Sequence, residues 1–295
     1  MRNHLIRASL LTMALVHVGL VQAIEPTIKS SELPKLVQEE QHAIASRRIA
    51  AFFTHSHYKQ IQLDDAFSKK VFALYLEGLD YSRNLLLQSD VDGFETYRKS
   101  LLAGMDKGDL SAVYYLYNQS IQRRYERLSY ALSLLDKPFD FTQTDSYQFD
   151  RKDAAWPKNS AELDELWRQR VKYDALSLKL AGKNWSEIKE LLIKRYQNAI
   201  KRLSQSESED VFQTVENAFA RSIEPHTSYL SPRNADRFNS EMNLSLEGIG
   251  AVLQADDDFT VVRSLVPGGP ADKSKQLKPD DKITGVAQDS GKMVD

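Results

Sequence analysis

The residues Gly248-Ile249-Gly250, followed by Ala251 and Val252, have the pattern of a site that binds a carboxylate through backbone atoms. Two glycines around one isoleucine predict a tight turn, and the β-rich run that follows predicts a strand. Consecutive backbone N–H groups in such a turn can point into one concavity, which suits a carboxylate. An edge strand beside the turn can also bind an extended peptide by backbone pairing. The alternative for a lone Gly-x-Gly is a β-bulge or turn without a ligand.

Other groups that could do chemistry have simpler structural interpretations. His55 and His57 would point about 200° apart on a helix, and no neighbouring Asp, Glu or Cys completes a zinc site. His226 and Ser228 are close in the sequence, but no nucleophile elbow or oxyanion-hole pattern accompanies them. The acidic run 256–258 lacks the spaced ligands and glycine of a calcium loop, so a hairpin turn is favoured. We therefore expect no catalytic residue, no metal site and no cofactor in this chain.

Most of the chain, from about residue 28 to residue 242, predicts helices because apolar residues recur at intervals of three and four. One predicted helix places four apolar residues near one face: Phe67, Val71, Leu74 and Leu79. A longer helix begins near Leu110 and is stopped by Lys137-Pro138. Its tyrosines point in several directions around the helix, so some are expected in the core and others on the surface. The alternative is that they form an aromatic stripe that binds a ligand. These tyrosines are Tyr114, Tyr115, Tyr117, Tyr125 and Tyr130.

Capping residues indicate where several helices begin. Three pairs have the spacing of a capping box: Asn159 with Glu162, Asn184 with Glu187, and Ser206 with Glu209. Ser231 before Pro232 has the pattern of a cap followed by proline at the first helical position. Residues 139–158 lack a helical period, which predicts an ordered connector between two groups of helices.

From about Leu244 the pattern changes to short β-rich runs separated by turn residues. The runs are IGAVLQ, FTVVRSLV and KITGVAQ. A Gly-Gly-Pro-Ala turn and a short helix are expected between the second run and the third. The fold class expected is therefore mainly α: a multi-helix domain followed by the first part of a small β-rich domain.

Residues 1–23 have the pattern of a secretory signal peptide. Arg2 and Arg7 form a basic start, residues 8–21 are mostly apolar, and Val21-Gln22-Ala23 is a cleavage site. We expect cleavage after Ala23, and an uncleaved N-terminal anchor is the alternative. No later run is apolar enough to span a bilayer, so no integral span is expected after the signal is removed. The absence of cysteine is compatible with an oxidising compartment.

The charge pattern argues against nucleic acid as a partner. The formal net charge is −2, and acidic and basic residues alternate along the 295 residues. A nucleic-acid interface would require a basic patch or stripe. The charged residues are therefore expected to form a solvated surface.

Several motifs together resemble a known family. The Gly-Ile-Gly turn, Pro267-Gly268-Gly269-Pro270-Ala271, Leu277 and Asp281-Lys282-Ile283 resemble the first half of a PDZ domain of bacterial protease type. The segment IEPHTSYL, then a helix and this module, is similar to the C-terminal-processing peptidases. The segments THSHYKQ, RRYERLSYALSLL and AAWPKN narrow the resemblance to the tail-specific proteases of Gram-negative periplasms, over nearly all of the chain after the signal peptide. One departure is Asp280, where the family usually has glycine.

The resemblance implies a periplasmic serine endopeptidase that recognises the apolar C-terminal tails of its substrates. It implies that the nucleophilic serine, the general-base lysine and the second wall of the PDZ groove lie beyond residue 295. It also implies three regions: a signal peptide (1–23), a helical N-terminal domain (24–243) and a partial PDZ domain (244–295). Gly248, Ile249, Gly250, Ala251 and Val252 are then the substrate-binding residues.

The partners implied by the resemblance are substrate tails, with a periplasmic adaptor protein as a further candidate. The alternative to the protease is an exported, non-catalytic module that combines helices with a PDZ-like peptide-binding part.

Overall fold

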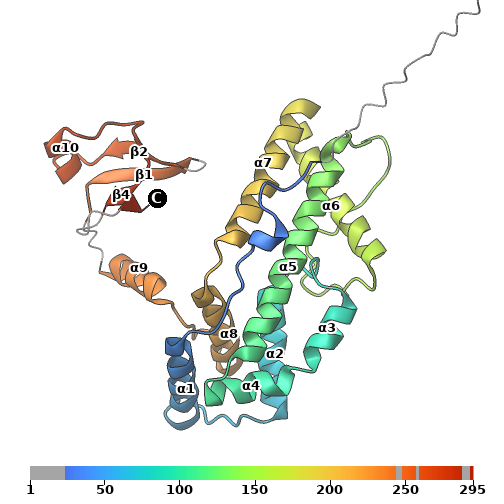
Figure 1. Ribbon diagram of the computed structural model, residues 1–295, viewed down its shortest axis with the longest axis vertical. Helices are drawn as coiled ribbons and strands as arrows, with labels where there is room; N and C mark the ends of the chain where they lie inside the picture. The colour runs from blue at the N-terminus through green and yellow to red at the C-terminus, as the bar shows by residue number, and fades with distance from the viewer. Residues whose placement is uncertain (1–23, 244–247, 257–258, 288–292, 295) are drawn as a thin grey trace, which may run out of the picture. The chain divides into compact units, whose positions relative to one another are not determined.

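The computed structural model describes residues 24–243, 248–256, 259–287 and 293–294 (Figure 1). The expected signal peptide and two residues of the acidic run, Asp257 and Asp258, lie outside the described residues. The chain divides into two compact units between Tyr229 and Leu230. The first unit is helical and the second contains the β-strands, so the fold class is mainly α, as predicted.

The first unit consists of helices joined by short loops and one long connector. Its elements are η1 (Ser30–Glu32), α1 (Glu40–His55), α2 (Asp65–Leu79), α3 (Gln88–Glu95), α4 (Arg98–Lys107), α5 (Ser111–Ser133), η2 (Leu134–Asp136), α6 (Ser160–Leu180), α7 (Trp185–Ser204) and α8 (Ser208–Ile223). None of the helices that the structure describes is both long enough and apolar enough to cross a bilayer.

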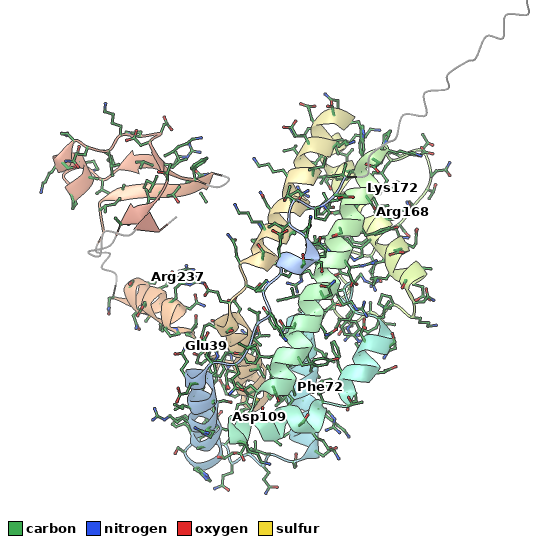
Figure 2. All side chains as sticks on the ribbon, viewed as in Figure 1. Glu39, Phe72, Asp109, Arg168, Lys172 and Arg237 are labelled. Atoms are coloured by element: carbon green, nitrogen blue, oxygen red, sulfur yellow. The ribbon has the colours of Figure 1, made fainter. Side chains whose placement is uncertain are left out.

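Two hydrophobic clusters stabilise the first unit. One gathers side chains of α1, α2, α4, α8 and the first half of α5, and Phe72 lies within it (Figure 2). The other gathers side chains of α6, α7 and the second half of α5 around Trp167. At 23 residues, α5 is about 34 Å long at 1.5 Å per residue. It is the one described helix that contributes buried side chains to both clusters.

The residues predicted to form the apolar faces of α2 and α5 mostly contact the two hydrophobic clusters. Val71 and Leu79 of α2 are buried, and Phe67 and Leu74 pack half-buried against the first cluster. Four of the five tyrosines belong to a core, with Tyr114 buried and the other three partly buried: Tyr117, Tyr125 and Tyr130. Tyr115 is the exception because 45% of it is exposed.

The three expected capping boxes have different outcomes. The box at Asn184 is confirmed, since its side chain accepts from Glu187 N at 3.1 Å and Glu187 accepts from Asn184 N at 2.8 Å. Asn159 caps α6 as expected, but the Glu162 carboxylate accepts from Lys158 N and not from Asn159 N.

The box expected at Ser206 and Glu209 is wrong. The N–H group of Ser206 donates to Leu203 O, so this residue belongs to the turn that ends α7. Glu207 is the N-cap of α8, and its N–H group donates to Asp210. The Glu209 side chain is engaged elsewhere, in a buried polar network described below.

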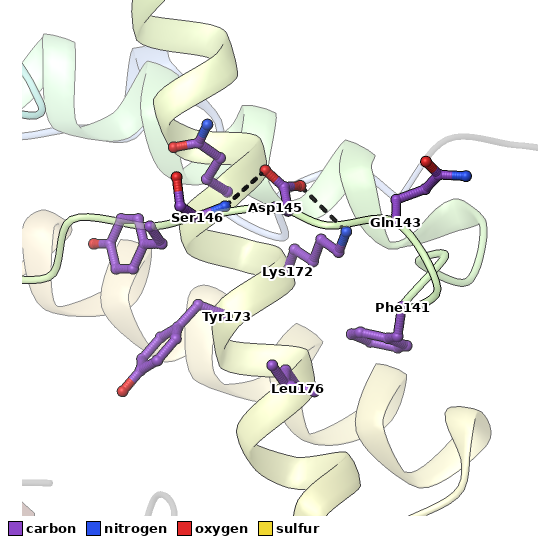
Figure 3. Close-up of a pocket in the computed structure, with 9 residues that line it drawn as sticks. Phe141, Gln143, Asp145, Ser146, Lys172, Tyr173 and Leu176 are labelled. Carbon is purple, nitrogen blue, oxygen red and sulfur yellow. Dashed lines mark hydrogen bonds and ion pairs between the residues drawn. The ribbon is translucent and has the colours of Figure 1, made fainter.

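The connector between η2 and α6 is ordered, as expected. The Asp145 carboxylate lies 3.2 Å from Lys172 Nζ (Figure 3). It also lies 2.8 Å from Arg168 Nη2, one helical turn before Lys172 on α6. Both cations lower the pKa of Asp145, with Arg168 contributing most. Phe139, Phe141 and Tyr147 of the connector pack against the second cluster. Ion pairs and aromatic packing therefore hold a segment that has no secondary structure of its own.

The second unit contains two short helices and two small sheets. Its elements are α9 (Pro232–Met242), β1 (Ala251–Asp256), β2 (Phe259–Leu265), α10 (Pro270–Ser274), β3 (Lys282–Ile283), β4 (Val286–Ala287) and β5 (Met293–Val294). One sheet has the antiparallel order β1-β2-β3, and the other pairs β4 with β5. Ser231 occupies the N-cap position of α9 and Pro232 begins the helix, as predicted, but the Ser231 side chain does not form the capping hydrogen bond. The single run expected over KITGVAQ is divided, because β3 and β4 belong to different sheets.

Candidate functional site

The Gly248–Gly250 turn is bonded to the rest of the second unit through its carbonyl groups. Ile249 O accepts from Ala271 N, and Gly250 O accepts from Val266 N, both at 2.8 Å. Gly250 has a φ of +72°, a left-handed conformation that side chains rarely adopt. The carbonyl bonds and this φ determine which way the N–H groups of the turn face.

Gly250 also lies against the Gly-Gly-Pro-Ala turn that precedes α10. A Cβ atom on Gly250 would lie 3.0 Å from Pro270 Cδ and 3.1 Å from Gly269 Cα. A Cβ atom on Gly248 would meet nothing within 4 Å. The two glycines of the motif therefore differ: Gly250 is required by conformation and by contact, and Gly248 is not.

The N–H groups of Ile249 and Gly250 have no acceptor among the described residues. Ala251 pairs with Leu265, and the bond from Val266 N to Gly250 O makes this the non-hydrogen-bonded type of antiparallel pair. In such a pair, the N–H and C=O groups of Ala251 point away from β2. Donors from the turn and the first strand residue are thus free to bind an acceptor that does not belong to the sheet.

Strand β1 has an open edge within the part of the chain that is described, since its sheet has the order β1-β2-β3. The register shifts between Val252 and Leu253, and the exposed fractions of these side chains are 51% and 44%. An open edge with apolar side chains can pair with an extended peptide. The predicted residues 248–252 therefore lie together as one continuous turn and strand start.

Asp280, the departure from the family pattern, occupies a position that favours glycine. Its φ is +71°, and its N–H group donates to Val262 O at 2.7 Å. Lys278 N donates to the Asp281 carboxylate at 2.8 Å and closes the same turn. The left-handed turn is thus retained with aspartate, at a cost in backbone strain.

The other candidate groups do not assemble into a site. His55 is the last residue of α1, and His57 accepts from Lys59 N. The side chain of His226 is 88% exposed, and its Nδ1 lies 3.5 Å from Glu224. No hydrogen bond joins His226 to Ser228 among the described residues, which also hold no group of three metal-ligating side chains.

Sequence reasoning missed a buried polar network in the first unit. His42, which is 1% exposed, has its Nε2 2.9 Å from Glu209. The N–H group of Glu39 lies 3.3 Å from His42 Nδ1, and Nε2 of the same ring faces the Glu209 carboxylate. The hydroxyl of Tyr229 donates to the other Glu209 oxygen at 2.9 Å, and Tyr114 lies 2.8 Å from His42 Nδ1. This network joins α1, α5, α8 and the segment after α8.

Glu216 is a second buried acid that sequence reasoning missed. It is 1% exposed, and neither carboxylate oxygen has a hydrogen-bond partner among the described residues. Burial raises the pKa of Glu216 to about 7, and the nearby Ser46 hydroxyl opposes the rise. Glu209 and Glu216 are seven residues apart on α8, on the side that contains Phe212 and Phe219. Acidic residues on a predicted apolar face are the signal that could have found both.

The cavity between the connector and α6 has a volume of about 140 Å³ and mixed lining (Figure 3). Phe141, Tyr173 and Leu176 provide apolar walls, and Lys172 is already paired with Asp145. This arrangement explains how the connector attaches to α6, and it leaves no free charged group to recognise a ligand.

Comparisons with known proteins identify both units. A family model described as "Tail specific protease N-terminal domain" matches residues 49–233, and a model described as "PDZ domain" matches residues 238–294. A tail-specific protease of Haemophilus influenzae is 48% identical over 274 residues. These residues are 92% of this chain but 39% of that relative, so the chain spans about two fifths of the relative's length. The chain belongs to the tail-specific protease family.

Proposed function

We propose that the Gly248–Val252 turn and strand bind the C-terminal tail of a polypeptide substrate. The N–H groups of Ile249, Gly250 and Ala251 bind the terminal carboxylate. The edge of β1 pairs with the residues that precede it. Exposed apolar side chains at Ile249, Val252 and Leu253 favour apolar tails. The observation that carries the proposal is a set of backbone donors beside an open strand edge, with no acceptor for them among the described residues.

The test compares two peptides with one apolar sequence, one ending in a free carboxylate and the other in an amide. Loss of a charge-assisted hydrogen bond costs about 1.5–3 kcal/mol, so amidation should weaken binding by roughly tenfold or more. The titration is made with the full-length protein. Equal affinities for the two peptides would limit the turn to a structural role.

We also propose that the full-length protein is a serine-type endopeptidase and that residues 1–295 recognise its substrates. Family membership supports this proposal. The chain of 295 residues should not cleave an unstructured protein with an apolar tail, because its sequence has no pattern of an activated nucleophile. Cleavage that a serine-directed inhibitor blocks and that survives Ser228→Ala would contradict this.

The proposed location is the periplasm, reached through the signal peptide at residues 1–23. Intact-mass measurement of exported material should find Ile24 at the N-terminus. Retention of Met1 would favour the anchored alternative. The proposed partners are substrate tails, with a periplasmic adaptor protein as a further candidate.

A further inference from the structure

Three arginines from three helices line one cleft of the first unit, away from the Gly248–Val252 turn in the sequence. Arg124 belongs to α5, Arg170 to α6 and Arg202 to α7. The cleft has a volume of about 460 Å³ and includes the loop that follows α2. None of the three guanidinium groups forms an ion pair with a carboxylate in the part of the chain that the structure describes. A cleft lined by one sign of charge raises the local concentration of anions.

Acidic groups near the cleft are already engaged with other donors. Asp80 is 3% exposed, and its carboxylate accepts from the N–H groups of Asn84, Leu85 and Leu86 at 2.8–3.0 Å. Burial raises the pKa of Tyr117, and Asp210 adds to the rise while Arg124 opposes it, so both charges lie near this hydroxyl. The Asp210 carboxylate accepts from Glu207 N. Asp174, one helical turn after Arg170 on α6, accepts from the Tyr196 hydroxyl at 2.8 Å and lies 3.5 Å from Arg195 Nη1. These three carboxylates reduce the positive charge of the cleft, and within the described part of the chain none of them forms an ion pair with the three arginines.

Two of the arginines are held in place before any ligand binds. Arg124 Nη2 donates to Leu79 O at 3.0 Å, and the Arg170 guanidinium lies 4.5 Å from the centre of the Trp167 ring. Trp167 is itself fixed, because its Nε1 donates to Asn84 O. Preordered guanidinium groups lose less conformational entropy when they bind an anion. Arg202, near the end of α7, is the third arginine of the cleft, and its side chain is exposed.

We propose that this arginine cleft binds side-chain carboxylates of an acidic polypeptide segment. Guanidinium groups bind carboxylates bidentately. Because the three arginines come from different helices with different anchors, they suit carboxylates spaced along a chain better than one small ion. Tyr81, which is 55% exposed, lines the cleft and provides an aromatic surface for such a segment. The inference rests on the family's action on polypeptides, but not on the proposed role of the Gly248–Val252 turn.

The test uses a short peptide that alternates glutamate with glycine and is acetylated and amidated, so that it has no terminal carboxylate. The control peptide has glutamine in place of glutamate. The glutamate peptide should bind the full-length protein, bind more weakly as salt is raised, and bind the Arg202→Gln variant on the order of tenfold more weakly. Arg48→Gln, which removes an exposed arginine of α1, is the matched control and should leave the affinity unchanged.

Several outcomes would overturn the proposal. These are no binding of the glutamate peptide, equal binding of the glutamine peptide, or equal losses from Arg48→Gln and Arg202→Gln. Tighter binding of inorganic phosphate than of the peptide, if Arg202→Gln reduces it, would assign the cleft to a small anion. Circular dichroism confirms that each variant is folded. A neutral peptide with a free terminal carboxylate tests the Gly248–Val252 turn separately, so failure of one site is distinguishable from failure of the other.

Discussion

Gly250 and Gly269 pack backbone against backbone. A Cβ atom on Gly250 would lie 3.1 Å from Gly269 Cα, and a Cβ atom on Gly269 would lie 3.2 Å from Gly250 Cα. Both distances are shorter than ordinary van der Waals contact. Two glycine motifs that are nearly twenty residues apart in the sequence therefore form one structural unit, and the bond from Ala271 N to Ile249 O ties the Gly248–Gly250 turn to α10.

Gly250→Ala should destabilise the second unit and weaken the binding of tails. The variant places a side chain at a φ of +72°, which costs about 1–2 kcal/mol before the contact with Pro270 is counted. Thermal unfolding measures the first effect, and titration with a free-acid apolar peptide measures the second. Gly248→Ala is the matched control, and it should be tolerated because its Cβ would meet no atom within 4 Å. Equal damage from both substitutions would contradict this account.

Gly250→Val and amidation of the peptide should not have additive effects on binding. Each removes the interaction between the turn and the terminal carboxylate, and losses that share one interaction do not sum. A double-mutant cycle with free and amidated peptides measures the coupling. Additive losses would indicate that Gly250 and the carboxylate act independently.

Asp280→Gly should stabilise the second unit by about 0.5–1 kcal/mol. Glycine relieves the strain of a φ of +71°, although it also raises the entropy of the unfolded chain. The ion pair with Arg263 spans 3.7 Å, with the Asp280 side chain 84% exposed, so its loss should matter little. Asp280→Ala should have the opposite sign, since alanine tolerates this conformation less well than aspartate. Denaturant unfolding should rank the variants glycine, aspartate, alanine.

Glu216→Gln should stabilise the first unit in a pH-dependent way. The pKa of Glu216 is raised from its ordinary value of 4.5 to about 7 in the folded state. The folded state therefore binds more protons than the unfolded state between these values, and the free energy of unfolding falls as pH rises through them. At pH 8 the neutral glutamine should recover about 3 kcal/mol of stability, and at pH 4 it should have little effect.

The measurement for Glu216 is chemical unfolding at several pH values between 4 and 8. Glu190→Gln, at an exposed position of α7, controls for the loss of a glutamate charge. A stabilisation by Glu216→Gln that is the same at every pH would show that the effect comes from packing and not from ionisation.

Asn184→Ala should destabilise the first unit by about 1 kcal/mol, because it removes the cap of α7. Ser206→Ala should change stability by less than about 0.5 kcal/mol, since Ser206 does not cap α8. Thermal unfolding of the two variants distinguishes the cap that forms from the one that does not. Equal losses of stability in the two variants would indicate that Ser206 does cap α8.

The sequence was sufficient to predict features of the structure that depend on residues close together along the chain. The long helix α5, the cap at Asn184 and the proline at the start of α9 are local features, and each was predicted. The Ser206 prediction failed because Glu207 competes with Ser206 for the N-cap position and Glu209 is drawn into the His42 network.

Features that depend on distant contacts could not be predicted in the same way. The separation of β3 from β4 depends on pairing with β2 and β5, which lie elsewhere in the sequence. Similarly, the burial of Glu216 depends on the packing of α8 with other helices. For the candidate site, the turn and the strand start at residues 248–252 were predicted from the residue types, but the contact with Gly269 depends on the folded turn.

The open edge of β1 has a consequence for self-association. Its backbone donors and its exposed Val252 and Leu253 are as available to the same strand of a second copy as to a substrate tail. On the proposed mode of tail binding, a second copy and a tail would compete for this edge, and the outcome would depend on their concentrations. We expect dilution or a saturating tail peptide to suppress any aggregation that begins at this strand.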